Sequence, residues 1–174
     1  MILPHALLLV PIAVLLFFAG WSDIVTRTIP NSVCLGLAVL GLAVRAIAGL
    51  PAVAASAAAA GLLFILLALA HARGAFGGGD VKLIAATALG LPLLMIPRFL
   101  VVTVIAGGVL ALLHLMLRRV FRNLPLMPPP ARGTALLRRV LIAERWRIAR
   151  RGPLPYGVAI AFGGIWAVIT GPGG

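Results

Sequence analysis

Acidic side chains are scarce in this sequence: Asp23, Asp80 and Glu144 are the only three among its 174 residues. Charged residues of both signs together make up only 10% of the chain. A soluble domain carries roughly a quarter charged residues, because its surface must face water. The shortage of charge therefore argues against a water-soluble protein, and 63% of the residues are hydrophobic instead.

Cysteine is also nearly absent. The single Cys34 excludes a disulfide within the chain and a zinc site built from cysteines. It lies in an apolar run, where a small buried thiol is the simplest interpretation. The three histidines, His5, His71 and His114, lie in three different segments, so we expect no metal site and no cofactor.

The apolar residues form long unbroken runs, which predict transmembrane helices. Because the runs are continuous and rich in Leu and Ala, they favour helices over the alternating strands of a β-barrel. Each run is long enough to cross a hydrocarbon core of about 30 Å at about 1.5 Å per residue. We therefore expect an all-α polytopic membrane protein, a single domain over residues 1–174 with about six transmembrane helices. The expected spans are 4–21, 32–50, 52–71, 81–97, 98–117 and 154–171.

Basic residues are distributed unevenly between the two sides of these spans. With the N-terminus outside, 13 of the 15 Lys and Arg residues lie on the cytoplasmic side, and only Arg45 and Arg98 lie on the other. Positive residues favour cytoplasmic connections, so the sequence predicts an inner-membrane protein with both termini outside. The net charge of +12 then requires no nucleic acid, because basic residues beside spans bind anionic lipids.

The connection 118–153 is the one extended polar segment. It contains a Pro-rich stretch at 125–130, for which we expect an extended backbone. Residues 134–151 then predict a helix on the cytoplasmic membrane surface, with arginines around an apolar side. We expect Glu144 to be a solvated partner of these arginines. The expected apolar side consists of Leu137, Val140, Leu141 and Ile148.

The other two acids, Asp23 and Asp80, both lie at the cytoplasmic ends of expected spans. The predicted orientation depends on Lys and Arg alone, so the placement of both carboxylates on one face is a separate observation. Two carboxylates held close together share one proton, because both cannot ionise cheaply. The ionised group can activate a water and the protonated group can donate to a peptide carbonyl, so such a pair suits peptide hydrolysis.

Each aspartate also has a structural interpretation. Asp80 follows three glycines and precedes an apolar run, which is where a helix N-cap residue lies. Asp23 could pair with Arg27, four residues on, if the helix continues that far. The three glycines predict an irregular backbone, whose free N–H and C=O groups could pair with a substrate strand.

These residues resemble the motifs of type IV prepilin peptidases, which are GxGD intramembrane aspartic peptidases. The GxGDxKL motif of that family is similar to Gly77-Gly78-Gly79-Asp80-Val81-Lys82-Leu83. Its first catalytic aspartate, with a downstream Ile-Pro-Asn, is similar to Asp23 followed by Arg27 and Ile29-Pro30-Asn31. Its Pro-aromatic-Gly element resembles Leu154-Pro155-Tyr156-Gly157. The three matches follow the order of the family and cover nearly the whole chain.

The resemblance implies a catalytic pair of Asp23 and Asp80. It implies a prepilin substrate with a basic leader, cut on the cytoplasmic side before its hydrophobic helix. Longer members carry a cytoplasmic domain with paired cysteines and also methylate the new N-terminus. This sequence has neither that domain nor those paired cysteines, and it is similar to the compact TadV/CpaA-like group. We therefore expect no N-methyltransferase activity. Substrate-binding or site-supporting roles are implied for Gly77, Gly78, Gly79, Lys82, Pro155, Tyr156 and Gly157.

Several alternatives remain open at this point. Lys82 could neutralise a neighbouring carboxylate or bind lipid headgroups. The segment 155–157 could contact substrate or could simply begin a helix with an interfacial aromatic. A non-enzymatic transporter or assembly subunit is the competing function, although a transporter usually places its carboxylates near the membrane midplane. A GxGD protease of the presenilin or signal-peptide-peptidase type is a further alternative, for which the chain is short. No pattern indicates the oligomeric state.

Overall fold

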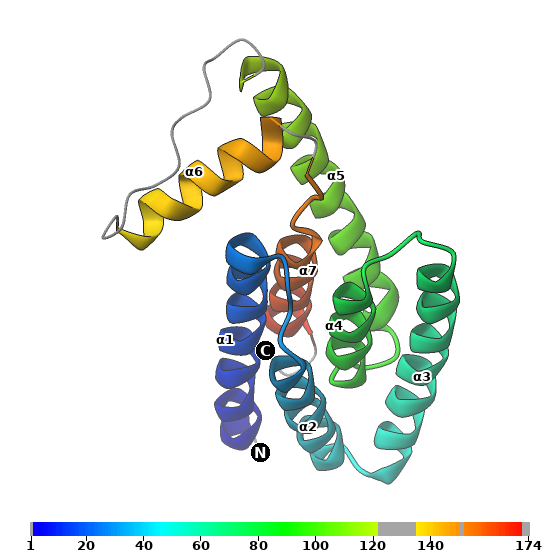
Figure 1. Cartoon of the computed structure of the whole chain (residues 1–174). Helices are drawn as coiled ribbons and strands as arrows, with labels where there is room; N and C mark the ends of the chain where they lie inside the picture. Colours follow the sequence, from blue (N-terminus) through cyan, green and yellow to red (C-terminus); the bar gives the residue numbers. More distant parts are fainter. Residues whose placement is uncertain (1, 122–134, 150–151, 172–174) are drawn as a thin grey trace.

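The structure is a computed structural model that describes residues 2–121, 135–149 and 152–171. In these residues it contains seven α-helices and no strand, so the predicted all-α class is confirmed (Figure 1). The Pro-rich stretch at 125–130 lies outside the described residues. The helices are α1 (Ile2–Thr26), α2 (Asn31–Ile47), α3 (Leu50–Ala72), α4 (Gly78–Leu89), α5 (Met95–Phe121), α6 (Leu136–Ala149) and α7 (Tyr156–Thr170).

Six of these helices correspond to the six predicted spans. The helices α1, α3 and α5 are long and apolar enough to cross a membrane, while α2 and α7 are shorter apolar helices of 17 and 15 residues. The helix α4 has only 12 residues. At about 1.5 Å per residue it is about 18 Å long, which is shorter than a core of about 30 Å.

Two of the predicted span ends are wrong by five residues or more. The first helix continues to Thr26 instead of ending at residue 21, so Asp23 lies inside α1. The fourth helix ends at Leu89 instead of residue 97, because Gly90 and Pro92 are poor helix residues that break the apolar run. The carbonyl of Leu91 in the resulting turn accepts a 3.0 Å hydrogen bond from Ser56 Oγ, to which Arg45 Nε donates in turn.

The core lies where five helices meet. The helices α1, α2, α4, α5 and α7 each contribute one large side chain that is fully buried. These side chains are Leu16, Leu37, Leu83, Phe99 and Ile160. The helix α7 packs against α1, α4 and α5, whereas α3 stands at the edge and buries only Ser56 and Ala60 (Figure 1).

Large apolar side chains cover the outside of the bundle. Phe17 on α1 is 68% exposed and Val104 on α5 is 63% exposed, and many Leu, Ile and Val side chains on the other helices are similar. Exposing such surface to water costs about 25 cal/mol per Å² of apolar area, a cost that lipid removes. With the long apolar helices, this surface identifies a membrane protein.

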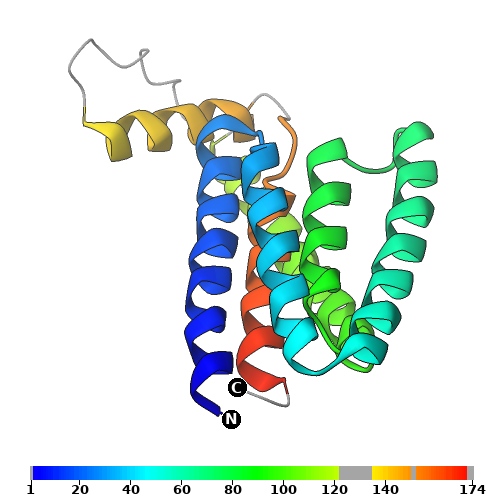
Figure 2. The same ribbon diagram turned by 90° about the horizontal axis from the view of Figure 1, so that it is seen from below.

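The helix α6 lies across the ends of α1 and α5, at the end of the bundle where α2, α4 and α7 begin (Figure 2). It confirms the helix predicted within 134–151. Of the four residues on the predicted apolar side, Val140 and Ile148 are buried, whereas Leu137 and Leu141 are exposed. Val140 and Ile148 are buried because α6 packs against α1 and α5.

Candidate active site

A hollow of about 350 Å³ opens at the α6 end of the bundle and contains both predicted aspartates. Its walls come from four segments that are far apart in the sequence: the end of α1, the link to α2, the start of α4 and the stretch before α7. Asp23 and Asp80 therefore line one cavity. The lining residues are Asp23, Arg27, Thr28, Ile29, Asn31, Gly77, Gly78, Gly79, Asp80, Lys82, Pro153 and Leu154.

Asp23 is held by the start of α7. Its side chain is 7% exposed, and its Oδ2 accepts a hydrogen bond from the backbone N–H of Gly157 at 2.8 Å. A Cβ atom on residue 157 would lie 2.9 Å from both Cβ and Oδ2 of Asp23. Only glycine therefore allows this approach of backbone to carboxylate.

The other residues of the segment 155–157 support α7. Pro155 is buried and occupies the N-cap position of that helix. The ring of Tyr156 packs against Gly107 of α5, so closely that a Cβ on residue 107 would lie 2.7 Å from it. Pro153 and Leu154 line the hollow, and neither was predicted as a site residue.

Asp80 is the third residue of α4 and is half-buried. The N-cap position belongs to Gly77, which has an extended backbone, so the N-cap interpretation of Asp80 is wrong. The backbone of Gly77 donates a hydrogen bond to the Asp80 carboxylate, as in a capping box, so Asp80 still supports the helix start. The predicted irregular backbone applies to Gly77 alone, because Gly78 and Gly79 already belong to the helix.

The surroundings of Asp80 favour its protonated form. Burial raises the pKa of Asp80 to about 6, and the negative charge of Asp23 acts in the same direction. The Gly77 hydrogen bond opposes this increase because it stabilises the ionised carboxylate. Two interacting carboxylates of this kind titrate as a pair, so a form with a single shared proton exists over a range of pH.

The Ile29-Pro30-Asn31 segment contacts the GxGD motif directly. The side chain of Ile29 lies 3.5 Å from the place of a Cβ on Gly79. Lys82 Nζ donates a 3.1 Å hydrogen bond to Asn31 Oδ1. Both interpretations considered for Lys82 missed this partner, and Asn31 itself was not predicted as a site residue. The position of Asn31 in the Ile-Pro-Asn element was the sequence signal that could have identified it as a site residue.

His71 at the end of α3 contacts the segment that leads into α4. Its Nδ1 lies 2.6 Å from the carbonyl oxygen of Phe76, and its ring lies 3.3 Å from the place of a Cβ on Gly78. The ring therefore fixes the approach to the glycines. Within the described residues, no three His, Cys, Asp or Glu side chains gather closely enough to hold a metal ion.

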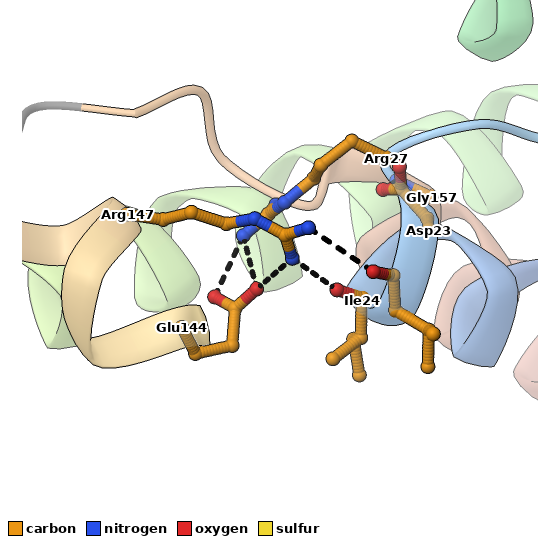
Figure 3. A network of polar contacts seen from close by, with 7 residues as sticks. Asp23, Ile24, Arg27, Glu144, Arg147 and Gly157 are labelled. Carbon is orange, nitrogen blue, oxygen red and sulfur yellow. Dashed lines mark hydrogen bonds and ion pairs between the residues drawn. The ribbon is translucent and has the colours of Figure 1, made fainter. Parts of the chain in front are cut away.

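A network of charges joins α6 to the end of α1 (Figure 3). Arg27 Nη2 lies 2.7 and 2.8 Å from the two carboxylate oxygens of Glu144, and Arg147 Nη1 lies 2.7 Å from Glu144 Oε1. Arg147 also donates to the carbonyl oxygens of Ile24 at 2.7 Å and Val25 at 3.0 Å. These carbonyls belong to the last turn of α1, where helix carbonyls lack intrahelical partners. The helix α6 therefore caps the helix that contains Asp23.

The prediction of a solvated Glu144 and the alternative interpretation of Asp23 are both wrong. Glu144 pairs with arginines as expected, but its side chain is only 18% exposed and is not solvated. The ion pair between Asp23 and Arg27 is not observed, because the Arg27 guanidinium turns to Glu144. Arg27 has a positive φ of 57°, uncommon for a residue with a side chain, and it turns the chain out of α1.

Comparison with protein families identifies the chain. Residues 10–112, more than half of the sequence, match the type IV leader peptidase family. The chain belongs to this family. The predicted family is thus confirmed, and the matched region of this leader peptidase contains Asp23 and Asp80, whereas Glu144, Arg147 and Gly157 lie beyond it. Neither the curated proteins nor the solved structures contain a match to the chain.

We predict that Gly157→Ala strongly reduces the peptidase activity. The added Cβ would stand 2.9 Å from the Asp23 carboxylate and force it away from the backbone N–H that holds it. We expect a loss of at least about tenfold in kcat/KM, or about 1.4 kcal/mol at the transition state. Gly108→Ala is the matched control, because no atom lies within 4 Å of a Cβ at that position. Equal activity of the two variants would contradict this account of Gly157.

We predict that Arg147→Ala destabilises the leader peptidase. The variant loses the hydrogen bonds to Ile24 and Val25 and the ion pair to Glu144. Hydrogen bonds from a charged donor contribute about 1.5–3 kcal/mol each, and part exposure lowers this, so we expect a total loss of about 1–3 kcal/mol. Denaturant unfolding in detergent micelles measures the change. Arg138→Ala, on the exposed side of α6, should stay within about 0.5 kcal/mol of wild type.

Proposed function

We propose that this leader peptidase is an aspartic endopeptidase that removes the leader peptide of Flp-type or type IV-like prepilins. The observation that supports this proposal best is the meeting of Asp23 and Asp80 in one hollow, although they belong to distant segments. The raised pKa of Asp80 adds to it, since one member of an aspartic pair must keep its proton. No cofactor has a part in this chemistry.

Asp23 takes the role of the general base in the proposed reaction. The N–H of Gly157 stabilises its negative charge. Asp23 accepts a proton from a water whose oxygen attacks the carbonyl carbon of the peptide bond. Asp80 donates its own proton to the carbonyl oxygen, which gives a neutral tetrahedral intermediate. When the C–N bond breaks, the proton on Asp23 passes to the departing nitrogen and a hydroxyl proton returns to Asp80.

The other residues of the hollow are proposed to bind the substrate backbone. Gly77 and the stretch Pro153–Leu154 leave a main-chain surface beside the two carboxylates. Arg27 lines the same hollow, where its positive charge favours the carbonyl oxygens of a bound peptide. Gly157, Pro155 and Tyr156 support the site by fixing the start of α7.

We propose that the hollow opens on the cytoplasmic side of the inner membrane. The end of α1, the link between α3 and α4, the helix α6 and the start of α7 all lie at one end of the bundle (Figure 2). These segments and the connection 118–153 contain most of the Lys and Arg residues, which favours cytoplasmic exposure and binding to anionic lipids. Since α1 begins and α7 ends at the opposite end, both termini are proposed to lie outside.

Methylation of the new N-terminus is not part of the proposed function. The sequence has a single cysteine, so it does not hold the paired cysteines found in methylating relatives. A transporter remains the competing class. It is disfavoured because Asp23 and Asp80 lie at one end of the bundle, where they can meet a cytoplasmic peptide.

We predict that Asp23→Asn and Asp80→Asn each abolish cleavage while the protein still accumulates in the membrane. An amide can neither accept the proton from water nor donate to the carbonyl oxygen as an acid, and the remaining aspartate cannot perform both steps. Co-expression with candidate prepilins, followed by gel shift of the cleaved product, measures the effect. A residual rate above about one hundredth of wild type in either variant would refute the pair.

We predict that kcat/KM falls as the pH rises. Asp80 has a raised pKa of about 6, so it keeps its proton below that pH and loses it above. Once both carboxylates are ionised the general acid is gone, and the rate then falls about tenfold per pH unit. The apparent pKa of this limb belongs to the pair rather than to Asp80 alone.

We expect the same pH–rate profile with a chelator, because the carboxylate pair needs no metal ion. Loss of activity on chelation with recovery on adding a divalent metal would contradict the mechanism.

We predict a topology with both termini outside. Reporter fusions after residues 49, 92 and 174 should indicate the periplasmic side, and a fusion after residue 74 the cytoplasmic side. Residues 49, 74 and 92 lie in the turns between helices, so a fusion there interrupts none of them. A cytoplasmic signal at residue 92 would contradict this topology, because it would mean that the chain does not cross the membrane between residues 74 and 92.

A further inference from the structure

An apolar groove of about 530 Å³ runs between α2, α3 and α4. Its lining extends from Asn31 to Ala38 on α2, from Lys82 to Leu89 on α4, and from Phe64 to Ala57 on α3. Within each helix the lining residues are spaced three or four apart, which places them on one face. Seven residues of helix rise about 10 Å, so the groove follows the three helices for about that distance into the bundle.

The groove begins at the candidate active site. Asn31 and Lys82 line both the groove and the hollow that contains the two aspartates, and they are joined by a hydrogen bond of 3.1 Å. Two other apolar hollows, between α5 and α7 and between α1 and α7, share no lining residue with the active-site hollow. Continuity with the site thus distinguishes this groove from these two apolar surfaces.

The α3 wall of the groove is left uncovered by the rest of the protein. Ala57 and Gly61 are exposed, and Phe64 is 44% exposed. Small side chains on a membrane helix allow another helix to approach closely. Figure 2 shows α3 at the outside of the bundle, and these exposed residues make the α3 wall of the groove accessible from the lipid.

We propose that this groove binds the apolar helix of the prepilin substrate, directly after the bond that is cut. The inference rests on the proposed function. A prepilin cut just before its helix must place that bond at Asp23 and Asp80 while the helix stays in the bilayer. A groove that leads from the hollow into the lipid-facing side meets both requirements. The first turn of the substrate helix then lies beside Asn31, whose amide oxygen can accept one of the free N–H groups found there.

The test narrows the groove at Gly61, a position with room for a Cβ atom. No atom lies within 4 Å of a Cβ at Gly61, so Gly61→Leu adds a side chain to the wall of the groove from a position with open space. Gly108→Leu on α5 is the matched control, because it is also a helix glycine with open space and lies outside the groove. With the prepilin that wild type cleaves in co-expression, we expect Gly61→Leu to lower kcat/KM by at least about tenfold and Gly108→Leu by less than about twofold. Wild-type cleavage by Gly61→Leu would overturn the groove proposal and leave the proposed function intact.

A cross-linking arm separates substrate from lipid as the occupant. Gly61→Cys and Gly108→Cys are each made in an inactive Cys34→Ser, Asp80→Asn background, labelled with a benzophenone maleimide, and illuminated with the same prepilin in membranes. We expect a prepilin adduct at residue 61 and none at residue 108. Adducts with phospholipid alone at residue 61 would overturn the proposal. If wild type cleaves no prepilin and residue 61 gives no adduct, the proposed function and the groove proposal both fail.

Discussion

The contact between the Asp23 carboxylate and the backbone of Gly157 joins the end of α1 to the start of α7. Because α7 also packs against α4 and α5, this contact relates the helix that contains Asp23 to the helix that contains Asp80. Close approach is possible only where a side chain is missing, and Gly157 and Gly164 of α7 both face atoms within about 3 Å of a Cβ position. The placement of the two carboxylates in one hollow therefore depends on small residues in α7 as much as on the aspartates.

A second constraint is the charge around Asp23. Arg27 is one helical turn away, yet its guanidinium pairs with Glu144 and leaves the Asp23 carboxylate to Gly157. Arg147 completes this arrangement by binding both Glu144 and the last carbonyls of α1. The helix α6 thus fixes the electrostatic surroundings of the candidate site although it contributes no residue to the lining of the hollow.

The sequence predicted the helices well, because long apolar runs depend only on local composition. It also predicted that Asp23 and Asp80 come together, since both lie at the same ends of spans. It failed where distant segments meet. Glu144 also pairs with Arg27, which is 117 residues away, and the partner of Lys82 is 51 residues away, so no local spacing indicates these two pairs. The end of α4 was missed because the run stays apolar through Gly90 and Pro92, although both residues are signals for a helix end.

The short helix α4 has a consequence for the interior of the bundle. It is about 18 Å long, whereas a hydrocarbon core is about 30 Å thick. Only Lys82 of α4 is exposed, because α2, α3 and α7 pack around this helix. Neighbouring helices rather than lipid therefore surround the irregular backbone that follows α4, and the carbonyl of Leu91 finds its hydrogen bond in Ser56, which Arg45 supports. Irregular backbone is tolerated at membrane depth where protein covers it, so the helix that contains Asp80 can be short without exposing free backbone groups to the acyl chains.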